Sequence, residues 1–203
     1  MVGIIDYGVG NLFSLRSSLE AIGETVVVSG DARVLGSAER VILPGVGAFG
    51  DAVKKLRESK LDRFVYQCAE AGTPLLGICL GMQMLFEKSY EYGTHAGLGL
   101  LPGEVVAMAQ HLPQDWKIPH IGWNSLEKKQ PDSRLLSGVE EGAYVYFVHS
   151  YHAVECEAVL AATTHYGIPM TAAVERGNVF GCQFHPEKSG GVGLAILKEF
   201  TKA

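Results

Sequence analysis

Residues 75–83 read LLGICLGMQ: an apolar run ends at a cysteine between two glycines and passes directly into a helical pattern. At such a strand-to-helix turn the central residue adopts a strained backbone conformation, and its side chain stands clear of the sheet. The start of a helix carries partial positive charge, which favours a thiolate, and the next residue, Leu80, can offer its backbone N–H to an oxyanion. The motif alone leaves two interpretations of Cys79 open, a nucleophile and an ordinary buried thiol.

Short apolar runs alternate with helical patterns on both sides of this turn. In the first half the pattern predicts strands over 2–6, 24–29, 40–45 and 74–79, and helices over 11–23, 49–59, 61–72 and 80–89. In the second half it predicts strands over 103–108, 120–128, 143–154, 159–167, 170–177 and 179–185, and a last helix over 191–202. Such alternation is typical of a parallel sheet covered by helices on both faces. The sequence therefore predicts an α/β fold with a mixed, mainly parallel sheet, flanking helices and an antiparallel extension, in a single domain spanning residues 1–203.

The composition excludes several classes of protein. With 203 residues, 47% of them hydrophobic and 19% charged, the chain has ample material for one globular core. The net charge of −5 offers no basic footprint for nucleic acid. No apolar run approaches the roughly 20 residues of a membrane helix, and the first residues show no export signal. We therefore expect a cytoplasmic protein that binds neither nucleic acid nor membrane.

Neither the cysteines nor the histidines show the spacing of metal ligands. The four cysteines, Cys68, Cys79, Cys156 and Cys182, lie far apart, and we expect reduced thiols. The seven histidines form no HExxH motif and no paired Cys/His set. We accordingly expect no metal and no other cofactor.

A base for a thiol nucleophile is offered by GCQFHPEKS at residues 181–189. Pro186 restricts His185 to an extended backbone, in which residues two apart point to the same side. Glu187 can therefore accept a hydrogen bond from one imidazole nitrogen and leave the other facing the thiol, as in a catalytic triad. Taken alone, the pair also fits a surface histidine beside a solvated glutamate; together with the turn at Cys79 it favours catalysis.

The glycines of LPGVGAFG, residues 43–50, suggest a third part of a site. A strand ends near Pro44, and the glycines let the backbone turn its N–H groups toward a ligand. Because Val46 lies between Gly45 and Gly47, its peptide can reorient at little cost. The alternative is a turn that merely starts a helix at Ala48. Neither this loop nor DYGVGNL at residues 6–12 has the spacing of a phosphate loop or of a dinucleotide fingerprint.

Together these motifs resemble the class I, or triad-type, glutamine amidotransferases. Seven blocks run in order over nearly the whole chain: IIDYGVGNL, LPGVGAFG, GICLGMQMLFEKS, GLGLLPGEV, PHIGWNSL, VYFVHSYH and QFHPEKSGGVG. Their order resembles the glutaminase subunits of imidazole glycerol phosphate synthase, which belong to histidine biosynthesis. The resemblance implies a flavodoxin-like core and the hydrolysis of L-glutamine to glutamate and ammonia without a cofactor.

The resemblance also implies roles for individual residues. Cys79 is expected to attack the carboxamide carbon and form a γ-glutamyl thioester, while His185 takes and returns the proton and Glu187 holds the imidazole. Backbone N–H groups of Leu80 and of Val46 or Gly47 are expected to stabilise the oxyanion. Gln83 lies one helical turn beyond Cys79, on the same face. The implied substrate-binding positions are Gly45, Gln83, Glu91, His149, Ser150 and Tyr151.

The implied partner is a (β/α)8-barrel cyclase subunit, in a heterodimer that uses the ammonia to make imidazole glycerol phosphate and AICAR. Because ammonia in neutral water becomes ammonium, which is no nucleophile, the reaction needs a dry path between the subunits. The resemblance places Trp123, Tyr146 and Lys188 on the partner face, although Trp123 also fits a core position. We hypothesise that the peptide at Val46 turns into the oxyanion hole only when partner and substrate are bound.

Other functions stay open at this point. The blocks DYGVGNL and PHIGWN argue against the glutaminase subunit of another synthase, such as that of the vitamin B6 pathway. A non-catalytic α/β module could use Cys79 as a redox sensor, since a reactive thiol suits both roles. A peptidase with a Cys–His dyad is a third alternative, although no signal of an extended substrate groove is visible. Ammonia release from glutamine distinguishes the enzyme from the sensor.

Overall fold

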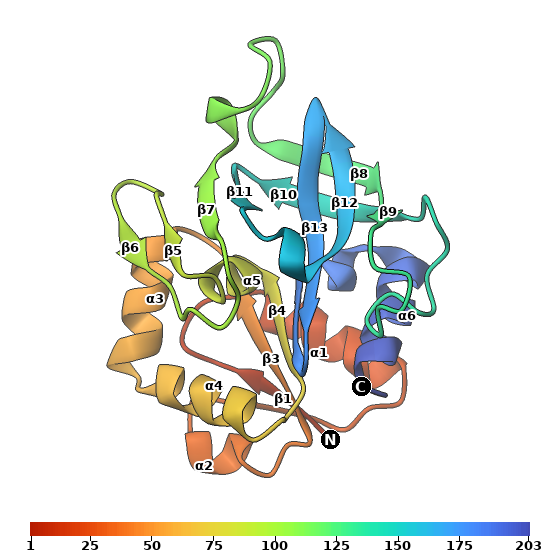
Figure 1. The fold of residues 1–203 in the computed structure, drawn as a ribbon. Helices are drawn as coiled ribbons and strands as arrows, with labels where there is room; N and C mark the ends of the chain where they lie inside the picture. The colour runs from red at the N-terminus through yellow and green to blue at the C-terminus, as the bar shows by residue number, and fades with distance from the viewer.

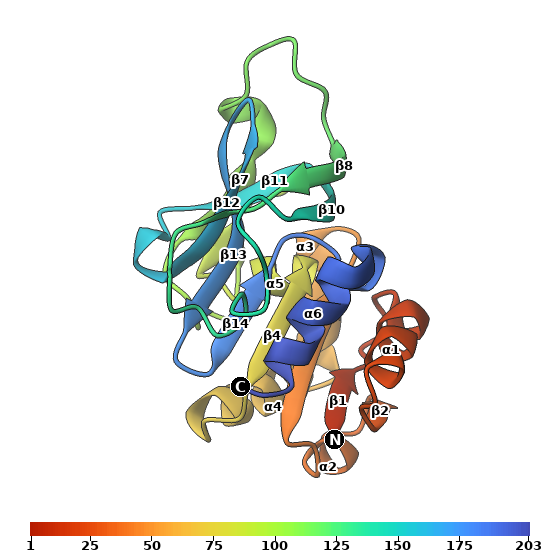
Figure 2. The ribbon, with the colours of Figure 1, turned by 90° about the vertical axis from the view of Figure 1, so that its right-hand side faces the viewer.

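An eight-stranded sheet runs through the molecule and separates two layers of helices (Figures 1 and 2). The structure, a computed structural model, describes all residues from 1 to 203. Across the sheet the strands are β2 (Val26–Ser29), β1 (Val2–Ile5), β3 (Arg40–Gly45), β4 (Leu75–Cys79), β14 (Val179–Cys182), β13 (Ile168–Arg176), β12 (Leu160–Tyr166) and β9 (Glu127–Lys128). Strands β2 to β14 are parallel, and β13, β12 and β9 are added in antiparallel fashion. The predicted mixed, mainly parallel sheet is confirmed, and its parallel part has the flavodoxin-like strand order.

Helices cover both faces of the parallel strands. Helices α1 (Leu12–Ala21) and α6 (Gly190–Phe200) lie on one face, and α3 (Phe49–Glu58) and α4 (Leu61–Glu70) lie on the other (Figure 2). In α3 the buried side chains of Phe49, Val53 and Leu56 recur at helical spacing, which turns one stripe of the helix toward the sheet. The buried apolar side chains accordingly form two clusters, one on each face.

Two small sheets from the second half of the chain stand beside the carboxyl ends of the parallel strands. One is a ribbon of β8 (His120–Ser125) and β10 (Tyr144–His149). The other contains, in order, β11 (Tyr151–Val154), β7 (Glu104–Ala107), β5 (Lys88–Ser89) and β6 (His95–Ala96). The remaining short elements are α2 (Ala32–Leu35), α5 (Leu80–Met84) and the 3-10 turns η1 (Met108–Gln110), η2 (Glu157–Val159) and η3 (Pro186–Lys188). In Figure 1 the chain between β7 and β8 extends furthest from the eight-stranded sheet.

Three predicted elements differ from the structure. The helix predicted over 80–89 ends at Met84, because the carbonyls of Met84 and Leu85 accept hydrogen bonds from the backbone of residues 98, 100 and 101 instead of continuing the helix. The strand predicted over 143–154 breaks at Ser150, so β10 and β11 join different sheets. The strand predicted over 120–128 likewise breaks at Leu126, between β8 and β9. Each break lies at a change of partner strand, which periodicity within one segment does not encode.

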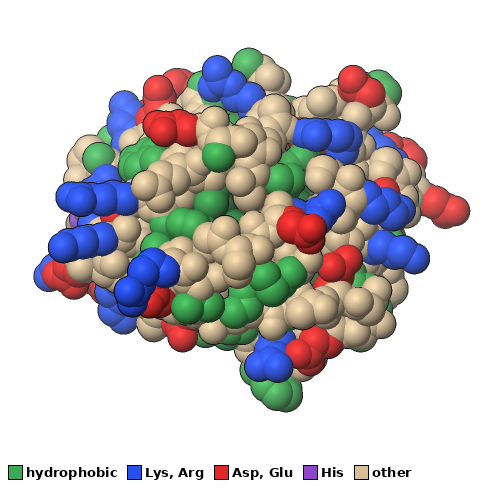
Figure 3. Space-filling model, turned by 90° about the horizontal axis from the view of Figure 1, so that it is seen from below, with side chains coloured by type: hydrophobic (Ala, Val, Ile, Leu, Met, Phe, Trp, Pro, Cys, Tyr) green, Lys and Arg blue, Asp and Glu red, His purple; other side chains and the backbone are tan.

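The end of the molecule that carries the two chain termini is shown in Figure 3. Basic and acidic side chains are intermixed over this face, with apolar side chains between them, and neither sign of charge forms a continuous field. None of the helices combines the length and the apolar character needed to cross a membrane. The opposite end, where β3, β4 and β14 finish, is where the predicted site residues gather.

Candidate active site

Cys79 is the last residue of β4 and the residue before α5. Its backbone has φ 55° and ψ −113°, a sparsely populated region that costs about 1–3 kcal/mol for a residue with a side chain. Cys79 is 8% exposed, so its side chain reaches a cavity while most of its surface is covered. The strained turn predicted at this cysteine is therefore present in the structure.

Glycines let α5 lie directly against the strands beneath it. A Cβ at Gly81 would overlap the carbonyl oxygen of Leu43, and a Cβ at Gly77 would lie 2.7 Å from the backbone nitrogen of Met82. A Cβ at Gly45 would lie 2.7 Å from the backbone nitrogen of Gly81. None of these three glycines has a positive φ, so they are required for space and not for backbone conformation. The glycines on both sides of Cys79 thus set its height above the sheet.

His185 reaches Cys79 because β14 pairs in parallel with β4, with Cys182 opposite Ile78. His185 Nδ1 lies 2.8 Å from Glu187 Oε1, and since a carboxylate only accepts, Nδ1 is the donor. The imidazole and the Cys79 side chain line the same cavity. The structure therefore brings the three predicted triad residues together, with Glu187 hydrogen bonded to the imidazole, and the imidazole on the wall of the same cavity as the thiol.

The array changes the protonation of its histidine. Burial by itself lowers the pKa of His185, but the hydrogen bonds and charges of Cys79 and Glu187 outweigh it and raise that pKa to about 9. His185 is therefore protonated at neutral pH when it faces a thiolate. The second carboxylate oxygen of Glu187, Oε2, is buried without a partner. All of the carboxylate's hydrogen bonding is thus directed at the imidazole.

A cavity of about 300 Å³ opens in front of the thiol. Its lining brings together predicted residues from five separate stretches of the chain. These residues are Val46, Gly47, Cys79, Leu80, Gln83, Glu91, His149, Ser150, Tyr151 and His185. Gly45 does not line the cavity; it lies opposite Cys79 in the pairing of β3 with β4. The break at Ser150 between β10 and β11 supplies the wall of backbone that faces the thiol.

The side-chain amide of Gln83 is held in place by two hydrogen bonds. Gln83 Nε2 donates to the Tyr151 carbonyl oxygen over 3.1 Å and to Gln183 Oε1 over 2.9 Å. Its amide oxygen takes part in neither bond, so it is the polar atom left for a ligand. An acceptor at this place suits an ammonium or amide donor of a bound molecule.

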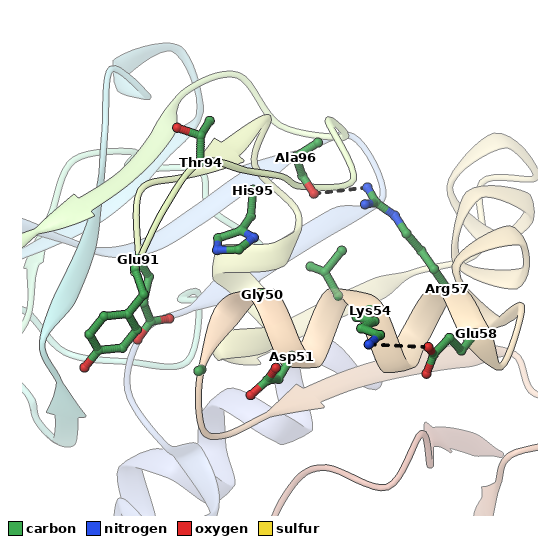
Figure 4. A pocket seen from close by; sticks show the side chains of 12 residues that line it. Gly50, Asp51, Lys54, Arg57, Glu58, Glu91, Thr94, His95 and Ala96 are labelled. Atoms are coloured by element: carbon green, nitrogen blue, oxygen red, sulfur yellow. Dashed lines mark hydrogen bonds and ion pairs between the residues drawn. The ribbon is translucent and has the colours of Figure 1, made fainter.

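Glu91 lines both this cavity and a second one of about 720 Å³. Figure 4 shows the second cavity. Glu91 Oε2 accepts a hydrogen bond of 2.6 Å from the backbone N–H of Phe49, at the start of α3. Burial raises the pKa of Glu91, and that hydrogen bond opposes the rise. The second cavity lies between α3 and the β5–β6 hairpin, where Lys54 pairs with Glu58 and Arg57 donates to the Ala96 carbonyl. Its lining contains no cysteine, whereas the smaller cavity has Cys79 and His185 on one wall, so we place the chemistry in the smaller cavity.

The three residues expected on the partner face form a cluster at the surface, with Trp123 and Lys188 exposed and Tyr146 half-buried. The rings of Trp123 and Tyr146 meet edge to face at 6.1 Å between centroids, and Lys188 Nζ lies 5.8 Å from the Tyr146 ring. Trp123 is 54% exposed, so the alternative of a core position for it is wrong. Exposed aromatic side chains with a cation beside them are typical of protein interfaces.

Sequence reasoning missed four residues of the site. Pro119 and Val148 line the cavity, and Tyr7 donates to the Pro44 carbonyl from below the loop at 45–47. Burial and the charge of Cys79 raise the pKa of Tyr7, which keeps its hydroxyl protonated as a donor. Gln183 is fully buried behind the thiol. All four residues stand inside quoted sequence blocks, but only Gln183 gave a signal of its own, as a polar residue within an otherwise apolar strand pattern.

The fold and this site define a class of protein: the chain belongs to the class-I glutamine amidotransferases, whose family profile matches residues 3–203. Within that class it belongs with the HisH subunits of imidazole glycerol phosphate synthase. It is 52% identical over 201 residues to the imidazole glycerol phosphate synthase subunit HisH of Aquifex aeolicus, covering 98% of this chain and 95% of the relative. It is also 52% identical to the HisH subunit of Geobacillus kaustophilus, covering 99% of this chain and 96% of that one.

A solved structure agrees with the fold. The structure of PurLQS from Thermotoga maritima superposes with a TM-score of 0.75 at 22% identity, covering 99% of this chain and 97% of that one. At this identity the likeness extends to the fold alone. No group of three or more His, Cys, Asp and Glu side chains in the structure is arranged to hold a metal ion.

Proposed function

We propose that this chain hydrolyses L-glutamine to glutamate and ammonia and delivers the ammonia to a synthase subunit that makes imidazole glycerol phosphate. The observation that carries the proposal is that Cys79 and His185 lie on the wall of one cavity, with Glu187 hydrogen bonded to the imidazole. The full-length similarity to HisH subunits supports the same function and its place in histidine biosynthesis. The alternative of a redox sensor would not require the carboxylate that orients the imidazole.

Each triad residue has one role in the proposed reaction. The Cys79 sulfur attacks the carboxamide carbon of glutamine, and the tetrahedral intermediate forms with its oxygen negative. The imidazolium of His185 gives its proton to the departing nitrogen, so ammonia leaves and a γ-glutamyl thioester remains. Water then attacks the thioester with His185 as base, which releases glutamate and returns the thiol. Proton transfer of this kind contributes roughly 10²–10⁴ in rate.

Two backbone segments are proposed to hold the oxyanion. Leu80 is the first residue of α5, so its N–H has no acceptor within the helix. The second donor is the peptide N–H of Val46 or Gly47, in a loop where Gly47 has φ +91°. One such donor is worth about 10²–10³ in turnover. The hypothesis that this peptide turns only with partner and substrate bound is supported by the open space around Gly47, in contrast to the crowding at Gly45.

Specific contacts are proposed for the head group of glutamine. The amide oxygen of Gln83 and the carboxylate of Glu91 suit its α-ammonium group. The backbone at His149, Ser150 and Tyr151 suits its α-carboxylate and holds the side chain in line with the thiol. These residues line the same cavity as Cys79, which supports the assignment.

The partner proposed for the cluster of Trp123, Tyr146 and Lys188 is a (β/α)8-barrel cyclase subunit, in a heterodimer. Barrel enzymes of this kind carry their chemistry at the carboxyl end of the strands, so ammonia is proposed to cross the barrel to reach it. We also propose that residues 1–203 act as one amidotransferase domain in the cytoplasm. The four cysteines are buried and unpaired, which supports a reducing compartment.

Ammonia release tests the proposal directly. We expect the wild type to release ammonia from glutamine when the synthase subunit and its nucleotide are present, and Cys79→Ala to lose more than about 10³-fold of this activity. Cys68→Ala is the matched control, because burial raises the pKa of Cys68 to about 11 and it lies in α4, away from the cavity.

Two outcomes would contradict these ideas separately. Absence of ammonia from the wild type in the complex would remove the proposed function, and full activity of Cys79→Ala would remove the proposed nucleophile. Equal rates with and without the synthase subunit would remove only the hypothesis of a turning peptide at Val46.

A further inference from the structure

Gln183 is a fully buried carboxamide immediately after β14. Burying an amide is costly unless its polar atoms are hydrogen bonded. The backbone N–H of Gln183 donates to the Ala172 carbonyl over 2.9 Å, which extends the pairing with β13. Its side chain does not continue any ladder: Oε1 lies 2.9 Å from Gln83 Nε2, and Nε2 lies 3.7 Å from Cys79 Sγ. The side chain of Gln183 therefore contacts both Gln83, which lines the cavity, and the Cys79 sulfur.

The orientation of this amide follows from its neighbours. The Tyr151 carbonyl can only accept, so the Gln83 atom that faces it is the nitrogen. The same nitrogen carries the second proton toward Gln183, so the Gln183 atom that receives it is the oxygen. The nitrogen of Gln183 is thus left facing the Cys79 sulfur. The His149 ring, whose Nδ1 lies 2.9 Å from the same Tyr151 oxygen, holds that carbonyl in place.

The sulfur has different partners on its different sides. The Val148 carbonyl oxygen, 4.0 Å away, accepts from the thiol and favours the protonated form. The N–H of Gln183 is a donor to the sulfur, and the imidazolium of His185, on the wall of the same cavity, is a positive charge; both favour the thiolate. A hydrogen bond to a charged acceptor is roughly twice as strong as a bond between neutral groups. The donor from Gln183 therefore acts mainly when the sulfur is ionised.

We propose that Gln183 is a further member of the catalytic machinery, whose amide N–H stabilises the Cys79 thiolate and fixes its position for attack. The inference rests on the proposed glutaminase function for its role in turnover. Because Gln83 anchors the amide and also lines the cavity, the chain from Gln83 through Gln183 to Cys79 links recognition of the head group to the nucleophile. Hydrogen bonds in such chains strengthen one another.

The test is the pH dependence of Cys79 alkylation by iodoacetamide, followed by mass spectrometry of the peptide that contains Cys79. The full-length chain is measured as wild type, Gln183→Met and Gln183→Glu, across the pH range in which cysteine and histidine titrate. We expect the pH midpoint of Cys79 alkylation to rise by about one pH unit in Gln183→Met. Methionine has a similar side-chain volume to glutamine and lacks the N–H donor. We expect at least the same rise in Gln183→Glu, because a carboxylate oxygen would then face the sulfur.

Two further variants distinguish stabilisation of the thiolate from simple packing. Gln83→Met removes the anchor of the amide, and we expect a smaller rise of the midpoint in the same direction. Thr171→Val is the matched control, since Thr171 is a buried hydroxyl bonded to the Ala153 carbonyl and to Cys156, with no contact to Cys79. It is expected to lower the melting temperature and leave the midpoint unchanged.

The outcomes separate this inference from the proposed function. Folded Gln183→Met and Gln183→Glu chains with the wild-type midpoint would overturn the role of Gln183, whatever their melting temperatures. In the complex with the synthase subunit, we expect Gln183→Met to lower kcat roughly tenfold with little change in KM. If the alkylation midpoints shift as expected but the wild type hydrolyses no glutamine, the proposed function fails and the thiolate contact stands.

Discussion

Histidine takes opposite protonation states within one small region of this molecule. Burial lowers the pKa of His120 to about 4, that of His149 to about 3 and that of His152 to about 4. At His185 the same burial is outweighed by Cys79 and Glu187, and the pKa rises to about 9. Burial alone therefore does not decide whether a histidine carries a proton at neutral pH, because charged neighbours can outweigh it.

Because of these pKa shifts, the free energy of unfolding depends on pH, and the buried neutral histidines and His185 contribute to that dependence in opposite directions. A histidine in an unfolded chain titrates near about 6.5. Between about pH 6.5 and 4 the unfolded chain binds a proton that the buried, neutral histidines do not, so the free energy of unfolding falls as the pH falls. The contribution of His185 has the opposite sign: it is complete below about pH 6.5 and is lost as the pH rises through about 9.

The acid side of this dependence is tested by His152→Leu. His152 is buried, its Nδ1 has no partner, and its Nε2 lies 3.2 Å from His111 Nδ1. We expect the free energy of unfolding at neutral pH to change by less than about 1 kcal/mol, because an imperfectly satisfied polar group is replaced by an apolar one. Its slope between about pH 4 and 6.5 should become shallower by roughly 1.4 kcal/mol per pH unit.

Urea unfolding at a series of pH values provides the measurement. His165→Leu is the control, because His165 is exposed and its removal should leave the acid slope unchanged. An unchanged slope in His152→Leu would mean that His152 is protonated in the folded protein at acid pH.

At the scale of elements, the site depends on how closely α5 approaches β3 and β4. The helices of the first half were predictable because the spacing of apolar residues within a helix is a local pattern. Helices α1, α3 and α4 begin and end within a few residues of the predicted ranges. The length of α5 was not predictable, because the backbone of residues 98–101 takes the carbonyls that a longer helix would use. The close approach of α5 is instead encoded in its glycines.

Adding one methyl group tests that approach. In Gly81→Ala the new Cβ meets the Leu43 carbonyl, which is backbone and cannot rotate away. We expect a loss of about 1–3 kcal/mol or more in the free energy of unfolding. Gly191→Ala is the matched control in α6, where a Cβ meets nothing within 4 Å and the φ is negative. Alanine should stabilise that helix by up to about 1 kcal/mol.

Denaturant titration of both variants gives the comparison. Equal stability of Gly81→Ala and the wild type would show that α5 can move away from β3. In that case the glycines would not set the position of Cys79.

At the scale of the whole molecule, the ribbon β8–β10 lies beyond the carboxyl end of β4 (Figure 2). The segments at the ends of β3, β4 and β14 and the end of β10 all contribute residues to the cavity. The surface cluster of Trp123 and Tyr146 belongs to that ribbon, in which the two residues are direct cross-strand neighbours. A partner bound there would lie over strands that lead directly to His149 and Ser150. The proposed docking surface and the proposed substrate cavity therefore share one structural element.

Replacing Trp123 with alanine tests the docking surface. We expect Trp123→Ala to weaken binding of the synthase subunit roughly thirtyfold, as for an aromatic hot spot worth about 2 kcal/mol. Because Trp123 is half exposed, the melting temperature of the isolated chain should change little. Tyr90→Ala is the control, since Tyr90 is an exposed aromatic beside β5, in the other small sheet. Calorimetry with the purified synthase subunit measures both, and equal affinities would contradict the assigned face.

The short-range geometry of the site could be predicted from the amino-acid sequence. A cysteine between glycines, a histidine held extended by proline, and a glutamate two residues further on are short-range patterns, and each fixes its own geometry within a few residues. The fold class followed in the same way, from alternating periods of strand and helix. The exposed position of Trp123 did not follow, because a large ring between small residues fits a core and an interface equally well.

The sequence by itself determined the class of fold, the strained turn at Cys79 and the pairing of His185 with Glu187, because these depend on neighbours along the chain. Only the tertiary structure decided that Gln183 lies behind Cys79, that Pro119 and Val148 close the cavity, and that residues 143–154 divide between two sheets. Gln83 and Gln183 are 100 residues apart in the chain, and their contact exists because β14 inserts between β4 and β13. Strand order is set by the packing of the whole core, and no local pattern carries that information.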